Sequence, residues 1–283
     1  MLINPPFLIP DGNLSRAWGH ALLRTLAPES QGLRSPLVVS IEEFDEQQLP
    51  VEVPAIRQAL DSAIAAHNGA PDRFEVQPVE HTSQVIFPHM CWRPDRQRPA
   101  EELFQWYRDR VFPKLKQRCR ANARGTYFLR MIDYKGAKGD EVKKVNQLGD
   151  IIDWHRQHKG RPPNKACQVV IRDPAKDHFG ARSEFPCLQQ VSFARHEDQL
   201  VVGAYYPTEN IFERGYGNYL GLCRLGCFMA HELRLQLARV DVFVLQPRLD
   251  APKTNRAMQT LAAVVQQELS MSDEVVVQEQ AAT

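Results

Sequence analysis

Residues 185–206 read FPCLQQVSFARHEDQLVVGAYY, and this stretch decides the fold. Apolar and polar residues alternate in two runs, 187–194 and 199–206, which Arg195-His196-Glu197-Asp198 separates. Alternation with a period of two, interrupted by a polar turn, predicts a strand, a turn and a second strand. The Pro186-Cys187 pair at the start places a thiol at the edge of the first strand.

Helical and strand patterns alternate on both sides of this unit. We expect helices over 13–26, 54–69, 100–120 (kinked or split at Pro113), 146–158, 217–238 and 254–269. Further strands are expected over 36–41, 127–132, 168–171 and 240–245, an exposed turn over 135–144, and strand and loop over 70–99. Strands that alternate with long helices predict a mixed α/β or α+β domain around one sheet.

The composition is that of an ordinary globular protein. A chain of 283 residues suits one large domain, and a hydrophobic content of 43% is enough for a core. The 35 Lys and Arg nearly balance the 34 Asp and Glu, so no global field would draw the chain to nucleic acid or to a membrane.

Targeting signals and cysteine usage point to the cytoplasm. No apolar run reaches the roughly 20 residues that span a bilayer, and the first fifteen residues contain no Lys or Arg. We therefore expect a soluble cytoplasmic protein without a secretory leader. The six cysteines form no CxxC pair, which favours reduced thiols over a disulfide framework.

The order of several motifs resembles that of the thymidylate synthase and pyrimidine hydroxymethylase superfamily. The family's nucleophile lies in Pro-Cys-His-x-x-x-Gln-Phe, followed by Tyr-x-Arg-Ser-x-Asp-x-Phe and by Leu-Pro-Phe-Asn opening a buried helix. The residues similar to these three motifs are Pro186-Cys187 with Phe193, Tyr205 with Phe212, and Asn218. Upstream, residues 125–130 look like the family's Tyr-Gly-x-x-Trp-Arg strand, so the likeness covers roughly 125–250.

The resemblance implies a thymidylate-synthase-like fold, in which one central mixed sheet packs with long helices and dimerises through the sheet. Residues 1–120 would then be a divergent N-terminal part of the same domain, and 121–270 its core. The acidic segment 271–283 is expected to be a frayed tail.

The resemblance also implies methyl or hydroxymethyl transfer to C5 of a uracil-type pyrimidine nucleotide. A thiolate that adds to C6 turns C5 into an enolate-like carbon, which then attacks a one-carbon donor. Cys187 would be this nucleophile and Asn218 would read the base edge, because a carboxamide donates and accepts together. Tyr205, Thr208 and Arg130 would line the substrate site, and the implied donor is methylenetetrahydrofolate.

Other roles for the same residues stay open. Cys187 can be a small core residue, and Asn218 can cap the helix that begins near it. A catalytically silent relative would use the fold to bind a nucleotide, a nucleic acid or a partner protein.

The chain departs from the family pattern at the implied phosphate and donor sites. The family's phosphate-binding Arg falls on Pro207, and the Asp that contacts the donor falls on Asn210, which cannot be an anion. The implied ribose contacts fall on Arg248 and Asp250. The arginines that could replace the missing one in space are Arg130, Arg172, Arg182, Arg214 and Arg248.

Two further clusters have structural explanations. Cys223, Cys227 and His231 lie at i, i+4 and i+8 on one expected helix, which spreads them too far for one tetrahedral zinc, so core packing is favoured. The basic run 108–124 follows Trp106 and Tyr107, which could stack with bases. A solvated helix face is the commoner role of such a run, so nucleic-acid binding is possible but not favoured.

Overall fold

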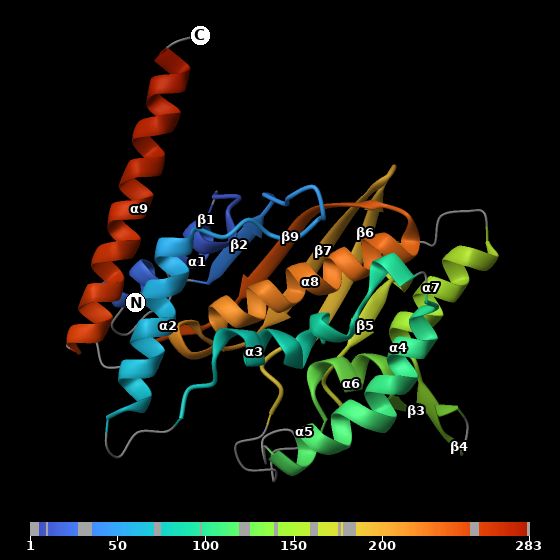
Figure 1. Ribbon diagram of the computed structural model, residues 1–283. Helices are drawn as coiled ribbons and strands as arrows, with labels where there is room; N and C mark the ends of the chain where they lie inside the picture. Colours follow the sequence, from blue (N-terminus) through green and yellow to red (C-terminus); the bar gives the residue numbers. More distant parts are fainter. Residues whose placement is uncertain are drawn as a thin grey trace. The chain divides into compact units, whose positions relative to one another are not determined.

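Six strands form the main sheet of the computed structural model, in the order β1-β2-β9-β7-β6-β5. Strands β1 and β2 pair in parallel, whereas β6 pairs antiparallel with both β5 and β7, so the expected mixed sheet is confirmed (Figure 1). Its strands are β1 (Phe7–Ile9), β2 (Leu37–Ile41), β5 (Gln168–Val170), β6 (Gln190–His196), β7 (Gln199–Tyr206) and β9 (Gln236–Val244). The structure describes residues 6–9, 11–27, 36–70, 75–96, 98–118, 125–138, 141–158, 164–174, 177, 185–249 and 255–281.

The remaining elements are helices and two short sheets. The small sheets pair β3 (Tyr134–Lys138) with β4 (Glu141–Val145), and β8 (Glu209–Asn210) with β10 (Pro247–Arg248). The α-helices are α1 (Leu14–Leu26), α2 (Pro54–Asn68), α3 (Val79–Ile86), α4 (Ala100–Trp106), α5 (Phe112–Arg118), α6 (Tyr127–Ile132), α7 (Gln147–Gln157), α8 (Tyr216–Leu233) and α9 (Arg256–Ala281). Two π-helical turns are η4 (Tyr107–Val111) and η7 (Ile211–Gly215), and short 3₁₀ turns are η2 (His89–Cys91), η3 (Pro94–Arg96) and η6 (Asn164–Ala166). No helix in the described part of the chain is long and apolar enough to cross a membrane.

The elements belong to two compact units. Unit 1 consists of Met1–Thr82, Thr208–Leu220 and Asp241–Thr283, and unit 2 of Ser83–Pro207 and Gly221–Val240. Strand β9 and helix α8 each contribute residues to both units, because the boundaries fall within them.

In unit 1, helices α1, α2 and α9 pack against one another, and α9 extends past the ends of the other two (Figure 1). Asn13 caps α1 as expected, because its side chain accepts hydrogen bonds from the backbone N–H groups of Ser15 and Arg16. Gly19 lets α1 approach α9 closely, since a Cβ there would lie 2.7 Å from Val265. Helix α9 continues to Ala281, where the sequence predicted an end near 269 and a frayed tail.

In unit 2, aromatic rings fill the core. Phe87, Phe104, Tyr107, Phe128 and Phe228 are buried, and their ring centroids lie 4.8–6.1 Å apart in contacting pairs. Such edge-to-face and stacked pairs add about 0.5–1.5 kcal/mol each beyond the area that they bury.

The two faces of the unit 2 sheet differ. Val191, Phe193 and Val202 lie on a face that is almost completely buried. Gln190 pairs with Tyr205 in the register, and Ser192 with Gly203, on a face that stays half-exposed or exposed. The alternation that predicted the β6–β7 hairpin therefore reflects burial on one face alone.

For two segments, the secondary structure predicted from the sequence is wrong. Residues 127–132 form helix α6, not a strand, because Thr126 caps Leu129 N–H and the chain buries Phe128, Met131 and Ile132 with helical spacing. Helix α3 replaces the strand and loop expected between 79 and 86. Residues 127–132 are a short, mostly apolar run, and such a run does not distinguish the helical period from the strand period.

Three other predictions differ from the structure in detail. Strands β3 and β4 pair antiparallel where the sequence predicted an exposed turn over 135–144. Helix α8 ends at Leu233, and Arg234 takes a φ of 55°, so β9 begins at Gln236 before the expected helix end at 238. The helix expected over 100–120 is divided into α4, the π-helical turn η4 and α5. Pro113 is the second residue of α5, directly after the change of register.

Candidate functional site

Cys187 lies three residues before β6, on the surface of unit 2. Its side chain is exposed and its thiol is not in a disulfide. The backbone N–H of Cys187 donates to the Tyr127 hydroxyl at 3.2 Å, and the N–H of Gln189 donates to the carbonyl of Tyr205 at 3.0 Å. Since the side chain is solvent-accessible, the structure does not place Cys187 in the core, which was its alternative role.

Asn218 lies in unit 1 beside a buried carboxyl group that sequence reasoning missed. Its Nδ2 donates to Oε1 of Glu209 at 2.9 Å, and the Tyr219 hydroxyl donates to Oε2 at 2.9 Å. Glu209 is 1% exposed and Asn218 is 3% exposed. Asn218 is the third residue of α8, and the turn before it is already helical, so it does not cap that helix.

Strand β8 positions Glu209. The Glu209 N–H donates to the carbonyl of Gln246 at 3.2 Å, and η7 then returns the chain so that the first turn of α8 covers the carboxyl group. Burial raises the pKa of Glu209 to about 7, although the hydrogen bonds from Asn218 and Tyr219 act in the opposite direction. Burial and the nearby Glu209 carboxyl raise the pKa of Tyr219 well above its ordinary value.

Arg130 is buried and committed to an ion pair, so it is not available as a surface phosphate ligand. Its guanidinium donates to both carboxylate oxygens of Asp177 and, at 3.1 Å, to the carbonyl of Ile171. Arg130 is 5% exposed, and Asp177 is completely buried. A buried pair of this kind holds its own segment in place, because each charge satisfies the other.

The other residues expected at the site have local partners or fall elsewhere. Cys187, Tyr205 and Arg130 belong to unit 2, whereas Thr208, Asn210 and Asn218 belong to unit 1. The Asn210 amide donates to Glu213 at 3.0 Å, and Glu213 also pairs with Arg214 at 2.9 Å. The resemblance implies an anionic side chain against the protonated ring of the one-carbon donor. Asn210 has no charge, and the neighbouring Glu213 carboxylate is already paired with Arg214, so neither side chain fits that contact.

Two of the remaining arginines are described. Arg172 is exposed, and Arg248 is exposed with its guanidinium bonded to the Gln246 side chain at 2.9 Å. Arg182 and Asp250 lie outside the described residues.

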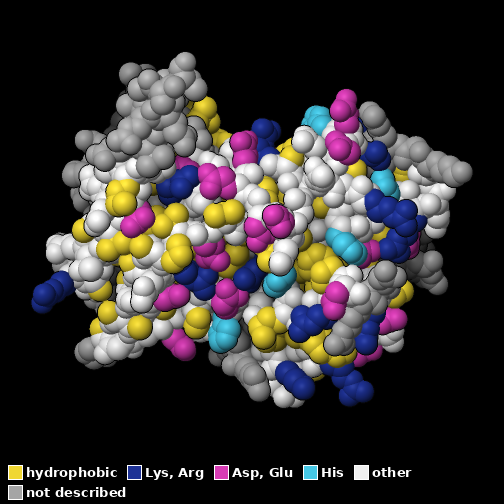
Figure 2. Space-filling model, turned by 45° about the horizontal axis from the view of Figure 1, so that its top comes forward, with side chains coloured by type: hydrophobic (Ala, Val, Ile, Leu, Met, Phe, Trp, Pro, Cys, Tyr) yellow, Lys and Arg dark blue, Asp and Glu magenta, His cyan; other side chains and the backbone are white. Residues whose placement is uncertain are grey.

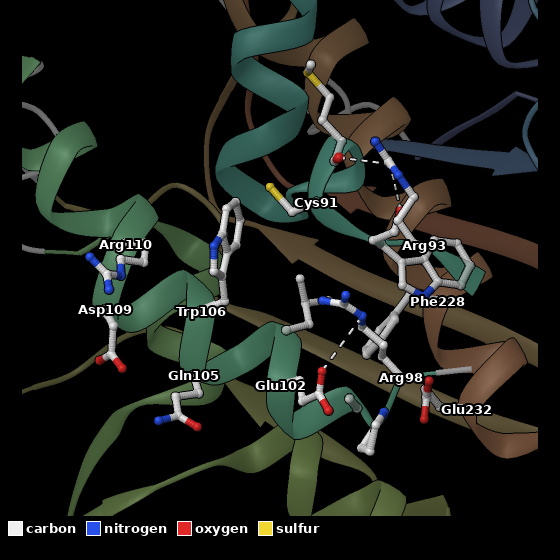
Figure 3. A pocket seen from close by; sticks show the side chains of 15 residues that line it. Cys91, Arg93, Arg98, Glu102, Gln105, Trp106, Asp109, Arg110, Phe228 and Glu232 are labelled. Carbon is white, nitrogen blue, oxygen red and sulfur yellow. Dashed lines mark hydrogen bonds and ion pairs between the residues drawn. The ribbon is translucent and has the colours of Figure 1, made fainter. Parts of the chain in front are cut away.

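Unit 2 also contains a pocket of about 550 Å³ that the sequence did not reveal. Figure 3 shows Cys91 and Trp106 on one side of it, and Arg98 reaching toward Glu102. Burial raises the pKa of the Cys91 thiol, while the charge of Arg93 acts against this rise. The lining comes from the turns before α4, from α4 and η4, and from the end of α8, so no single sequence motif marks it.

Metal ligands and charge patches give no further site. In the described ranges, no three His, Cys, Asp or Glu side chains are grouped as they would be around a metal ion. Cys223 and Cys227 are buried, as core packing requires, whereas His231 is exposed and its ring lies against Trp92. On the face shown in Figure 2, acidic and basic side chains are interspersed, without a broad field of one sign.

The comparisons with known proteins identify no relative. The chain matches no protein-family model, and no curated protein sequence is significantly similar to it.

Proposed function

We propose that this protein transfers a one-carbon unit to C5 of a uracil-type pyrimidine nucleotide. In the proposed reaction the Cys187 thiolate adds to C6, and the electron pair of the C5–C6 double bond moves to C5 as an enolate-like adduct. C5 then bonds to the electrophilic carbon of the donor. After loss of the C5 proton, the donor's heteroatom leaves with the electrons of its bond to that carbon, and an exocyclic methylene remains on C5. Water adds to this methylene to give a hydroxymethyl group, or a hydride from the donor adds to give a methyl group, and the thiolate departs from C6 as the C5–C6 double bond is restored. The exposure of Cys187 supports this role, because a nucleophile must meet its substrate.

The observation that carries the proposal is the hydrogen bond from Asn218 to buried Glu209. One hydrogen of the Asn218 amide is used by the carboxylate, so the second hydrogen and Oδ1 remain for a ligand. Among the described residues, no hydrogen bond reaches this Oδ1. A uracil edge needs one donor at O4 and one acceptor at N3–H, which is what the amide retains.

Glu209 also fixes which way the amide faces. An ionised carboxylate only accepts hydrogen bonds, so flipping Asn218 would set Oδ1 against Oε1 of Glu209. A flipped amide would exchange its donor and acceptor positions and suit the cytosine edge, where N4 donates and N3 accepts. At a pH above the pKa of about 7, the ionised Glu209 would therefore favour a uracil-type base over a cytosine-type base.

Covalent trapping tests the nucleophile. A nucleotide with fluorine at C5, 5-fluoro-2′-deoxyuridine 5′-monophosphate, cannot lose a C5 proton, so its adduct with the enzyme and the donor persists. We expect intact-mass spectrometry to show this adduct, and peptide mapping to place it on Cys187. Methylenetetrahydrofolate is the first donor to test.

Matched cysteine variants control the experiment. Cys187→Ser should abolish the adduct, while Cys91→Ser, which changes another accessible thiol of unit 2, should retain it. An adduct that survives Cys187→Ser contradicts the assignment of the nucleophile. The absence of any adduct with 5-fluorouracil and 5-fluorocytosine nucleotides contradicts the proposed reaction.

The open face of the unit 2 sheet supports a homodimer. Val170 and Tyr205 are 41% and 36% exposed on it, and their neighbours Gln190, Ser192 and Gly203 are uncharged. Depletion of charge is typical of the centre of a protein interface. We expect a dimer in light scattering, Val170→Glu to dissociate it, and Leu8→Glu on β1, where Leu8 is 66% exposed, to leave it intact. A wild-type monomer would contradict this assembly.

A second function is a nucleotide- or partner-binding protein without chemistry. The Arg130–Asp177 ion pair favours it, together with Pro207 where the resemblance implies a phosphate-binding arginine. Reversible nucleotide binding in calorimetry, without an adduct on Cys187, would select this function.

A further inference from the structure

We propose that the unit 2 pocket binds a nucleotide unit, with its base stacked on Trp106 and its phosphate held by Arg110. The pocket does not include Cys187 or Asn218, so this inference does not depend on the proposed reaction. Its volume of about 550 Å³ falls in the usual range for small-molecule sites, roughly 300–1,000 Å³.

Trp106 supplies the stacking surface. Its side chain is 46% exposed, whereas the adjacent Tyr107 is fully buried and bonded to the Thr126 hydroxyl at 2.7 Å. The two aromatic residues therefore have different tasks: Tyr107 anchors the π-helical turn to the core, and Trp106 presents its indole ring at the pocket (Figure 3). Aromatic stacking suits every base because each base has a π face.

The guanidinium groups of the pocket are weakly committed. Arg98 lies 3.9 Å from Glu102, and both side chains are more than half exposed, so this ion pair contributes little. Arg110 is exposed, and within the described ranges no ion pair holds it. Arg93 donates to the carbonyls of Met90 and Trp92, which do not neutralise its charge. A phosphate would gain charge-assisted hydrogen bonds from these groups.

The carboxylates of the pocket do not cancel this charge. Glu232 is nearly buried and already paired with Arg156, which lies on α7. Asp109 is exposed beside Arg110 at the edge of the pocket and can accept hydrogen bonds from the amino or imino groups of a base.

A base with a phosphate can be presented to the pocket by two kinds of ligand: a free nucleotide, or one nucleotide of a single-stranded nucleic acid. Lys114 and Lys116 are exposed on α5, which continues the chain from Arg110. A single strand would place further phosphates along these lysines, whereas a free nucleotide would not reach them. Each phosphate that a lysine neutralises adds to the salt dependence of binding. Binding of an oligonucleotide should therefore depend more steeply on salt than binding of a free nucleotide if a single strand is the ligand.

Fluorescence titrations test the site with two probes, uridine 5′-monophosphate and a fluorescein-labelled octathymidylate. We expect Trp106→Leu and Arg110→Gln each to weaken binding about tenfold, in line with the loss of one stacked base or one phosphate contact. Trp154→Leu is the matched control, since Trp154 is 37% exposed on α7 outside this pocket. A double change of Lys114 and Lys116 to Gln should weaken only the octathymidylate if a single strand is the ligand.

The outcomes are distinct. Binding of both probes that depends on Trp106 and Arg110 supports the site, and the lysine variant then identifies its source. The inference is overturned if neither probe binds the wild-type protein. It is also overturned if circular dichroism shows both pocket variants to be folded and they bind as tightly as Trp154→Leu.

Discussion

Replacing Glu209 with Gln should remove a pH-dependent loss of stability. Burial raises the pKa of Glu209 from 4.5 to about 7, so the folded state holds its proton over a range in which the unfolded chain has lost it. The favourable contribution is fully present below pH 4.5 and is lost as the pH rises through 7. A difference of about 2.5 pKa units corresponds to about 3 kcal/mol, at 1.36 kcal/mol for each unit.

Gln keeps the shape and the hydrogen bonds without the charge. Its carbonyl can accept from Asn218 and its amide can donate to the Tyr219 hydroxyl, so the network remains satisfied. We expect the stability of Glu209→Gln relative to wild type to rise by about 2–3 kcal/mol between pH 5 and pH 8.

Urea unfolding at several pH values measures this difference. Glu213→Gln controls for the loss of one negative charge in the same region, since Glu213 lies on the neighbouring π-helical turn. A relative stability of Glu209→Gln that stays constant from pH 5 to pH 8 would refute the argument from burial.

Three further substitutions test the packing of unit 2 and of α2. Asp177→Ala should destabilise the protein by about 3–5 kcal/mol in urea unfolding, because it leaves the Arg130 charge buried without its partner; a loss below 1 kcal/mol would contradict the buried pair. Gly221→Ala should cost about 1–3 kcal/mol, since the new Cβ would lie 2.7 Å from the backbone carbonyl oxygen of Ser83, whereas Gly69→Ala at the end of α2 meets nothing closer than 3.5 Å and should be nearly neutral; equal melting temperatures would contradict this. Thr126→Ala should cost about 1–2 kcal/mol, because it removes the α6 cap and the hydrogen bond to the Tyr107 hydroxyl; unchanged thermal unfolding would show that these bonds contribute nothing.

The proposed base reader makes a separate prediction. Gln at position 209 can turn its own amide, so it would accept either orientation of Asn218. Glu209→Gln should therefore reduce the preference for deoxyuridylate over deoxycytidylate in calorimetric titrations. A loss of affinity that is equal for both nucleotides would assign Glu209 a structural role only.

Local patterns in the sequence determined much of the fold. The Asn13 cap, Pro54 at the start of α2 and the alternation in β6 and β7 depend on neighbouring residues alone, so they were predicted correctly. The sequence did not determine α6, because a six-residue apolar run suits a strand or a helix until its core contacts are known.

The chemistry of the candidate site depended on tertiary structure. Nothing local marks Glu209 as buried: its donors lie nine and ten positions later, and β10 covers its strand from further along the chain. The ion pair of Arg130 could not be predicted either, because its partner Asp177 is 47 positions away in the sequence. The sequence specified the thiol of Cys187 and the carboxamide of Asn218, but only the folded chain decided which groups surround them, because burial and charge pairing arise between distant segments.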